Sequence, residues 1–418
     1  VSEEFYPSDT VIKVRDSRIG WASAYRELIS LLYAGKIPQW DTSKIRPKGE
    51  PLKTFGGQAS GPEPLNRLFQ FTIQTFKNAA GRQLNSIECH DLMTSVGDCV
   101  VSGGVRRSAL ISLSNLSDDR MRNAKTGQWY VHYPNRGLAN NSAVYNERPD
   151  FEVFLDEWAS LYKSKSGERG IFSRVAAQKQ AKKNGRRDHT QVQGTNPCSE
   201  ILLRSCQFCN LSEVVVRPED TQADIKAKIK IAAIIGTLQS TLTDFRYLRR
   251  IWKKNTEEER LLGVSLTGVM DHPVLRQASD KSVEWLESFK ALAVQTNEKY
   301  AKMLGINQAA AITCNKPSGT VSSLVDSASG IHPRFDQYYL RTVRANKTEP
   351  IAHYMIDQGF YYEEDAMKPD QGYVFYFPMK APKSSVCADK MTAIDQLKVW
   401  ELYNDHYCEH KPSLTAYY

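Results

Sequence analysis

Apolar and polar residues alternate along short stretches of this 418-residue chain, and in other stretches they recur at helical spacing. Residues 10–16, TVIKVRD, alternate in the way that is typical of a half-buried β-strand. From Trp21 to Ala34 the apolar side chains fall on one helical face, and Gly35 follows as a suitable C-terminal cap. The pattern therefore predicts a strand followed by a helix near the beginning of the chain.

The rest of the chain continues this alternation of helical and extended patterns. Helices are predicted at 63–96, 150–163, 175–183, 222–247 and 282–304. Strand character is predicted for Cys99–Ser114, interrupted at Gly103–Gly104, and for Ser199–Leu203. For Ala310–Val325 the pattern predicts a strand, then a tight loop, then the start of a helix. Thr54–Pro62, TFGGQASGP, is too rich in glycine and proline for regular structure and predicts a shaped loop. Because strands and helices alternate, we predict an α/β barrel or sheet with one core.

The composition is that of an ordinary globular protein. Hydrophobic residues make up 41% and charged residues 24%, and no apolar run approaches the length of a membrane helix. No secretory signal opens the chain. Its eight cysteines are irregularly spaced, unlike a disulfide framework, so we expect a reducing, cytoplasmic setting and no membrane partner.

The formal net charge is +8, with basic clusters at Lys179–Arg187 and Arg246–Lys254. Such clusters are most often solvated surface, but they also suit binding of polyphosphates or nucleic acid. No aromatic-basic repeat and no zinc-finger spacing accompanies them, so we predict no nucleic-acid partner and leave anionic small molecules open.

Three cysteines lie close together in GTNPCSEILLRSCQFCNL, residues 194–211. A structural zinc site would use Cys206 and Cys209 with Cys198, but no second CxxC and no nearby histidine completes a tetrahedral set. A thioredoxin-like pair is disfavoured because the CxxC does not open a helix after a strand. Four of the other five cysteines are interpreted as buried packing residues; they are Cys89, Cys314, Cys387 and Cys408.

A different chemistry is indicated by the residues around Cys198. Pro197 disfavours helical geometry at Asn196, so the segment is predicted to be extended. In an extended segment Asn196, Cys198 and Glu200 point the same way, roughly 6–7 Å apart. A thiol beside a carboxylate is harder to ionise, which suits a neutral thiol that loses a hydrogen atom. Glu200 would then act as a base and Asn196 as a hydrogen-bond partner for a hydroxyl.

NPCSE, followed by CNL eleven residues after its cysteine, resembles the active-site segment of ribonucleotide reductases. The same family is indicated, in order, by VRDSRIGW, IRPKGEPLKTFGGQASGP, GGVRRSALISLSNLSDDRM, LANNSAVY, SGERGIF, GVSLTG and KPSGTVSSLVDSASGIHPRF. The set is similar to the adenosylcobalamin-dependent (class II) branch, especially its monomeric triphosphate-reducing members. The resemblance covers nearly the whole chain.

The resemblance implies a fold, a reaction and a cofactor. The fold would be a ten-stranded α/β barrel of the ribonucleotide reductase and glycyl-radical type, incomplete at both ends. Residues 1–418 would form a single, partial catalytic domain, in which 1–50 contribute an effector-site strand and helix. The reaction would be reduction of ribonucleotides, expected as triphosphates, to 2′-deoxyribonucleotides for DNA synthesis. The cofactor would be adenosylcobalamin, and no metal ligands are predicted.

Roles for individual residues follow from the same resemblance. Cys198 would carry the thiyl radical that takes the 3′ hydrogen, Glu200 would deprotonate the 3′ hydroxyl and Asn196 would bind the ribose hydroxyls. Cys209 would be one half of the reducing pair. The KPSGT loop, Pro317, Ser318, Gly319 and Thr320, would bind substrate phosphate together with Ser60 and Gly61. The effector site and specificity loop would comprise Asp16, Ser17, Asn140, Asn141, Ser142, Arg106 and Arg107.

The chain also departs from the family pattern. No cysteine precedes Cys89 to complete the reducing pair, and Cys408 alone does not match the family's C-terminal cysteine pair. Ser199 stands where the family often has glycine, and we expect this change to be tolerated. We therefore expect an inactive fragment of a longer or split reductase, whose partners are a ribonucleotide, a deoxynucleotide or ATP effector, and a thioredoxin-type reductant. The alternatives are the large subunit of a diiron-dependent (class I) reductase and a catalytically incomplete nucleotide-binding module.

Overall fold

The computed structural model describes residues 1–50, 52, 59–99, 101–102, 105–106, 108–347, 349–366, 369 and 372–416. The chain separates into two compact units. The first unit comprises Val1–Phe172 and Val343–Phe375, and the second comprises Ser173–Thr342 and Tyr376–Tyr418. The predicted loop Thr54–Pro62 lies largely outside the described residues, as do Gly103 and Gly104.

The first unit begins with a strand, a helix and a second strand, as the hydrophobic pattern predicts. β1 (Tyr6–Lys13) pairs in parallel with β2 (Lys36–Asp41), and α1 (Arg18–Tyr33) connects them. The Ser17 hydroxyl caps α1 by accepting a hydrogen bond from the Gly20 N–H at 3.0 Å. α2 (Glu63–Asn78) packs its apolar face against α1 in a core of fully buried side chains; these include Leu28, Leu32, Phe69 and Phe76.

The remainder of the first unit is built on a three-stranded sheet in the order β5-β6-β7. β5 (Leu110–Ser114) and β6 (Ala139–Tyr145) are parallel, and β7 (Gly170–Ser173) follows. The accompanying helices are α3 (Ser86–Cys99), α4 (Asp119–Arg122), α5 (Trp129–His132), α6 (Phe151–Ser164) and α12 (Pro350–Asp357). Two short strands, β3 (Val101–Ser102) and β4 (Val105–Arg106), form a hairpin. A further sheet has the order β12-β14-β13, with bounds Tyr338–Asn346, Gly372–Lys380 and Tyr362–Glu364, and its strands β12 and β14 contain residues of both units.

The second unit contains the segment around Cys198. Its strands are β8 (Gly194–Thr195), β9 (Leu202–Leu203), β10 (Asn210–Val215) and β11 (Leu262–Thr267). Its helices are α7 (Arg174–Lys183), α8 (Gln222–Gln239), α9 (Arg250–Glu259), α10 (Asp280–Leu304), α11 (Thr320–Leu324) and α13 (Ala393–His406). α8 ends eight residues before the predicted limit, because the Ser240 and Thr241 hydroxyls bond back to the carbonyls of the last turn, at 2.7 Å each.

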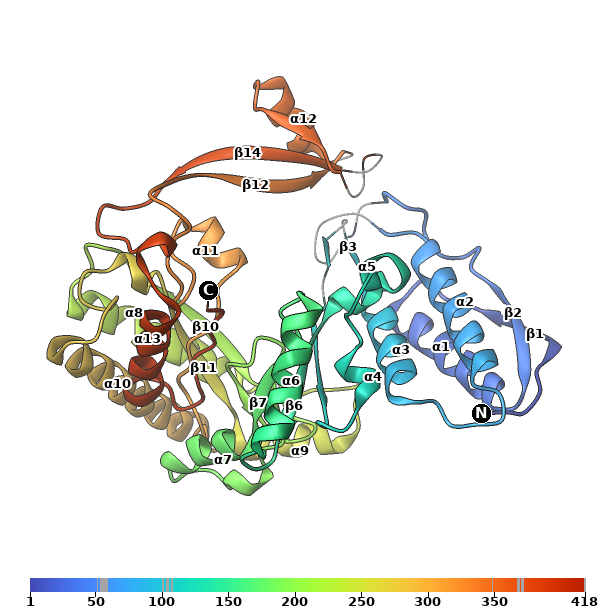
Figure 1. Ribbon diagram of the computed structural model, residues 1–418, viewed down its shortest axis with the longest axis horizontal. Coiled ribbons are helices and arrows are strands. Elements are labelled where there is room, and N and C mark those ends of the chain that lie inside the picture. Colours follow the sequence, from blue (N-terminus) through green and yellow to red (C-terminus); the bar gives the residue numbers. More distant parts are fainter. Residues whose placement is uncertain are drawn as a thin grey trace. The chain divides into compact units, whose positions relative to one another are not determined.

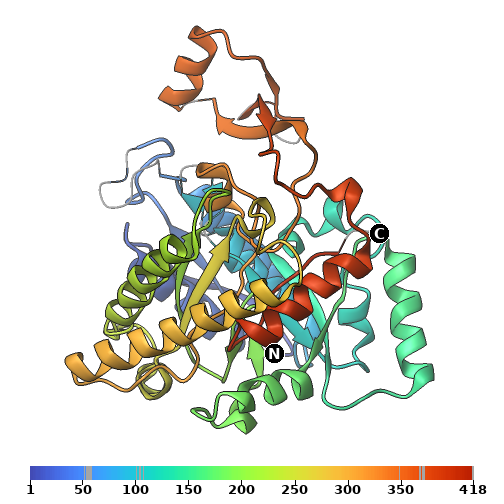
Figure 2. The same cartoon turned by 90° about the vertical axis from the view of Figure 1, so that its left-hand side faces the viewer.

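Parallel strands form the centre of the second unit. β10 pairs with β11 from Asn210↔Leu262 to Val215↔Thr267. On the other side of β11 the segment 311–314 is hydrogen-bonded alongside the strand, since the Leu262 N–H donates to the Ala311 carbonyl at 3.0 Å. A bridge between Asn315 and Pro412 then adds the segment 410–413. α8, α10 and α13 lie side by side against these strands (Figures 1 and 2) and bury an apolar core with them.

Gly263 allows the second unit to pack closely at the middle of β11. A Cβ atom at this position would lie 2.5 Å from the Leu211 side chain, 3.0 Å from Ile201 and 3.1 Å from the Cys314 sulfur. Any larger residue would therefore displace the segment that contains Ile201, which directly follows Glu200.

The described strands form separate sheets of two or three strands. The α/β character is as predicted, whereas the ten-stranded barrel and the single 1–418 domain stay predictions. Within the described part of the chain, no helix combines the length and the apolar character that crossing a membrane requires.

Candidate active site

Cys198 lies in the turn of a short hairpin. β8 and β9 pair antiparallel through Gly194↔Leu203 and Thr195↔Leu202. In the connection, the Ser199 N–H donates to the Asn196 carbonyl at 2.9 Å, and the Asn196 side-chain oxygen accepts from the Ile201 N–H at 2.9 Å. The predicted extended geometry of this segment, and its predicted strand from Ser199, are therefore wrong. Pro197 favours the second position of a tight turn as readily as an extended chain.

Ser199 adopts a left-handed backbone conformation, with φ of 65°. This conformation is strained for any residue except glycine, which explains physically why glycine suits the position. We expect Ser199→Gly to raise the free energy of unfolding by about 1 kcal/mol, measured by urea denaturation. Ser205→Gly is the matched control. Ser205 is not among the positive-φ residues, so glycine there should not raise the free energy of unfolding. An equal gain in both variants would contradict the explanation.

Cys198 and Glu200 differ sharply in exposure. Cys198 is exposed at the turn, whereas Glu200 is fully buried. Neither carboxylate oxygen of Glu200 has a hydrogen-bond partner within the described part of the chain. A buried carboxylate without partners is costly, and such groups concentrate at sites where a substrate supplies the missing hydrogen bonds.

The environment keeps the Cys198 thiol protonated. Partial desolvation of the thiol by its neighbours raises the pKa of Cys198, the charge of Glu200 raises it further, and Lys316 opposes both effects. Burial likewise raises the pKa of Glu200, while Asn196 and the cations Lys316 and Lys411 lower it. A neutral thiol beside a carboxyl group of raised pKa matches the chemistry of hydrogen-atom loss and general-base catalysis.

Two lysines near Glu200 were not recognised from the sequence as site residues. The Lys411 N–H donates to the Glu200 carbonyl at 3.2 Å, which brings the segment after α13 to the hairpin. Burial lowers the pKa of Lys411 to about 8, and Glu200 opposes that shift. Lys316 is the first residue of the KPSGT motif, so the sequence could have indicated it as a site residue. Lys411 is brought to Glu200 only by the tertiary structure.

Cys209 lies directly before β10, on the same side of the strand pair as Leu211. Burial raises the pKa of Cys209 to about 12, with a contribution from the Glu200 charge, so the two side chains share one environment. Cys314 is on a segment two strands away from β10, and two strand spacings amount to about 9.6 Å. This exceeds the Cα separation of about 7 Å that a disulfide permits, so Cys314 is no partner for Cys209.

The other cysteines separate into buried and accessible groups. Cys314, Cys387 and Cys408 are buried, as the packing interpretation predicts, but Cys89 is exposed, and for it the interpretation is wrong. The Cys206 sulfur accepts a hydrogen bond from Arg249 at 3.4 Å. Over the described ranges, no three or more His, Cys, Asp or Glu side chains are grouped so as to hold a metal ion.

The KPSGT loop begins directly after the strand segment that contains Cys314. The Lys316 N–H donates to the Ser265 hydroxyl at 2.9 Å, which fixes the start of the loop on β11. Ser318 is buried, and its hydroxyl accepts from the Ser322 N–H at 3.0 Å. Pro317 is partly buried, while Gly319 and Thr320 are exposed at the start of α11. Backbone groups at Gly319 and Thr320, rather than the Ser318 side chain, are therefore available to a ligand.

The predicted effector residues all belong to the first unit. Asp16 forms an ion pair with Arg46 at 2.7 Å, and the Ser17 side chain is occupied as the α1 cap. The predicted flexible loop at residues 140–142 is wrong: Asn140, Asn141 and Ser142 lie in β6, because their backbone pairs with β5. Ser60 and Gly61 precede α2, Arg106 lies in β4, and Arg107 lies outside the described residues.

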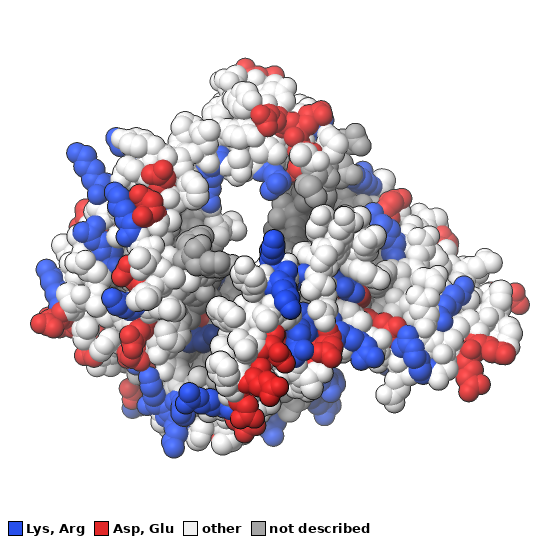
Figure 3. Space-filling view, in the orientation of Figure 1, with Lys and Arg blue, Asp and Glu red and all other residues white. Residues whose placement is uncertain are grey.

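The two basic clusters are interleaved with acidic partners. Lys183 pairs with Asp405 at 3.2 Å, and Arg186 pairs with Glu409 at 2.6 Å. In the second cluster, Arg246 pairs with Asp244 at 2.7 Å. Figure 3 shows blue and red side chains interspersed over the visible face rather than a single basic stripe. These contacts favour the interpretation of the paired residues as solvated surface. Arg187, the last residue of the first cluster, is buried instead.

Comparisons with known proteins bear on this site. The family described as B12-dependent ribonucleotide reductase, insertion domain, matches residues 3–75. An adenosylcobalamin-dependent ribonucleoside-triphosphate reductase of Euglena gracilis is 26% identical over 409 residues, covering 96% of this chain and 54% of its own length. A reductase of the same name from Levilactobacillus brevis is 29% identical over 405 residues, covering 88% of this chain and 53% of its own.

A crystal structure of a B12-dependent (class II) ribonucleotide reductase superimposes with a TM-score of 0.78 at 22% identity, covering 98% of this chain and 60% of that one. The fold is thus the α/β fold of a ribonucleotide reductase. The predicted resemblance to the adenosylcobalamin-dependent branch is confirmed by family match, relatives and fold. The chain spans about half the length of the curated relatives it matches.

Proposed function

We propose that the protein containing this chain is an adenosylcobalamin-dependent ribonucleotide reductase that takes ribonucleoside triphosphates, and that the chain forms part of its ten-stranded catalytic barrel. The observation that carries the proposal is that Cys198 and Cys209 both lie near Glu200. The charge of Glu200 raises the pKa of both thiols. The names of the relatives support both the substrate class and the cofactor.

Each residue has a defined step in the proposed reaction. The Cys198 thiyl radical takes the 3′ hydrogen of the ribose, and Glu200 takes the proton of the 3′ hydroxyl. Asn196, at the base of the hairpin, orients the ribose hydroxyls. The 2′ hydroxyl leaves as water, and two thiols supply the two electrons and two protons as they become a disulfide. Cys209 is one of these thiols. Cys198 then returns the hydrogen atom to the 3′ carbon and Glu200 returns the proton to the 3′ oxygen.

The residues present fit a radical-generating cofactor. Cys198 is exposed at a hairpin turn and protonated, so its S–H bond is accessible to a radical. Adenosylcobalamin, when bound, supplies the carbon-centred radical that removes this hydrogen atom.

Substrate phosphate is proposed to bind at Gly319 and Thr320. The substrate-binding role of Ser60 and Gly61, which belong to the other unit, stays a prediction. A deoxynucleotide or ATP effector would bind the first unit near Asp16 and Ser17, and a thioredoxin-type dithiol would reduce the disulfide. These assignments follow the family pattern quoted from the sequence. The working compartment is proposed to be the cytoplasm.

The test is an assay of the full-length protein with ribonucleoside triphosphates and a dithiol, with and without adenosylcobalamin. Deoxynucleotide formation that requires adenosylcobalamin is the expected result. Formation that instead requires a separate radical-delivering subunit would favour the diiron-dependent class and contradict the proposal. The isolated 418-residue chain is expected to be inactive, because Cys209 lacks its partner thiol here.

A further inference from the structure

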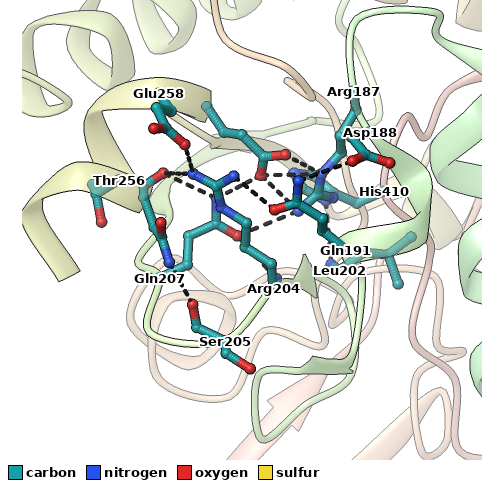
Figure 4. Close-up of polar contacts among 12 residues, drawn as sticks. Arg187, Asp188, Gln191, Leu202, Arg204, Ser205, Gln207, Thr256, Glu258 and His410 are labelled. Atoms are coloured by element: carbon teal, nitrogen blue, oxygen red, sulfur yellow. Dashed lines mark hydrogen bonds and ion pairs between the residues drawn. The ribbon is translucent and has the colours of Figure 1, made fainter. Parts of the chain in front are cut away.

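The connection between the two proposed reacting cysteines is held mainly by polar side chains. Residues 203–208 join the hairpin that contains Cys198 to Cys209, and Figure 4 shows charged and amide side chains surrounding this connection. We call Arg187, Gln207, Glu259 and His410 the polar clamp. All four side chains are buried, with exposed fractions from 0 to 9%. Buried polar groups of this kind are tolerated only when they are bonded, and then they fix geometry strongly.

Gln207 holds the side of the connection that leads to Cys209, two residues further on. Its side-chain oxygen accepts from the Arg204 N–H at 3.0 Å and from the Arg187 guanidinium at 3.3 Å. Its side-chain nitrogen donates to Glu259 at 2.5 Å. Arg187 and Glu259 in turn form an ion pair at 2.9 Å. Gln207 therefore ties the backbone before Cys209 to a buried ion pair.

His410 holds the hairpin side. Its Nδ1 accepts from the Leu202 N–H at 3.2 Å, and its Nε2 donates to the Leu262 carbonyl of β11 at 2.9 Å. These two partners require the neutral ring with the proton on Nε2. Burial and the charge of Arg187 lower the pKa of His410 to about 3, which keeps the ring neutral. The next residue, Lys411, bonds the Glu200 carbonyl, so the same segment supports the hairpin twice.

The proposed chemistry explains why this connection should be rigid. Cys198 and Glu200 act on the 3′ position of a ribose, and Cys209 must then reach the neighbouring 2′ position of the same ring. A misplacement of about 1 Å can cost about 100-fold in rate. The clamp holds the two ends of the connection separately, one through Gln207 and the other through His410.

We propose that Gln207 and His410 are positioning residues with separate tasks: Gln207 positions Cys209, and His410 positions the hairpin with Cys198 and Glu200. The proposal rests on the proposed function for its catalytic consequence. The underlying contacts, however, can be tested without any turnover.

The first measurement is hydrogen exchange at single amides of the full-length protein, which requires no turnover. In Gln207→Met, exchange of the Arg204 amide should rise about tenfold or more, because this amide loses its acceptor. The Leu202 and Lys411 amides keep their acceptors and should stay protected. His410→Leu should give the reverse pattern, and His410→Gln, whose amide offers both a donor and an acceptor, should restore protection. Gln191→Met is the matched control, since Gln191 is exposed and its side-chain oxygen accepts from the Arg204 guanidinium rather than from the Arg204 backbone N–H.

The second measurement uses the full-length protein and separates hydrogen abstraction from reduction. Gln207→Met should lower kcat for deoxynucleotide formation about 100-fold, with KM changed less than about twofold and release of a 3′ isotope label retained. His410→Leu should lower label release and reduction together, and His410→Gln should recover most of both. A merely structural role would not produce this split between the two variants.

Two outcomes have different meanings. The assignment of separate tasks would be overturned if Gln207→Met and His410→Leu raised exchange at all three amides equally. It would also be overturned if both variants lost label release and reduction equally. If the amide pattern appears as expected but the unmodified full-length protein forms no deoxynucleotide, the clamp stands as described and the proposed function fails.

Discussion

Cys198→Ser in the full-length protein is expected to abolish deoxynucleotide formation, with a loss of more than about 10⁴-fold, because a hydroxyl does not replace a thiol as a hydrogen-atom donor and acceptor in radical transfer. Cys198 is exposed at the hairpin turn, and serine is close to cysteine in size. The variant should therefore fold normally and bind nucleotide with the same affinity. Deoxynucleotide formation per minute and nucleotide affinity are the two measurements.

Cys206→Ser is the matched control for this prediction. Cys206 lies in the same segment, and its sulfur contacts Arg249 rather than Glu200. Activity within about twofold of the unmodified protein is expected, as for a surface substitution away from the chemistry. Full activity of Cys198→Ser would show that Cys198 does not carry the radical.

Glu200→Gln is expected to lower kcat by about 10²–10⁴-fold, the usual contribution of a general base, while KM changes little. The side chain is fully buried, its carboxylate oxygens have no hydrogen-bond partner among the described residues, and the amide has nearly the same size and shape as the carboxylate. Glu219→Gln, on an exposed side chain, is the control and should leave kcat unchanged. Unchanged kcat in Glu200→Gln would exclude Glu200 as the base.

The pH profile gives a second measure of Glu200. Burial raises its pKa, and a base must be ionised, so kcat should fall as pH decreases through a value above the ordinary carboxyl range. Lys316 and Lys411 oppose this shift, whereas Cys198, Cys209 and Cys314 face Glu200 as protonated thiols. Glu200→Gln should lose this acidic limb. An acidic limb that persists in the variant would assign it to another group.

Helices were predicted well where the apolar spacing was long and the caps were local. α1 and α10 lie within about three residues of their predicted limits, because Gly35 and Gly305 end them by short-range geometry. Strands were predicted less well, because a strand exists only through pairing with a distant partner. Asn140 to Ser142 show this: a polar segment predicted as a loop is held in β6 by its backbone bonds to β5.

The sequence by itself determined the chemical identities at the candidate site, because Asn196, Cys198, Glu200 and Cys209 are close in the chain and their order is specific. It also indicated the KPSGT loop and the α/β class. Only the tertiary structure decided that the Cys198 segment is a turn and that the Glu200 carboxylate is buried with no hydrogen-bond partner among the described residues. It also brought Lys411 and His410, more than 200 residues further along the chain, to the hairpin. The physical reason is that turn geometry, burial and charge proximity depend on backbone pairing between distant segments, which local side-chain patterns do not encode.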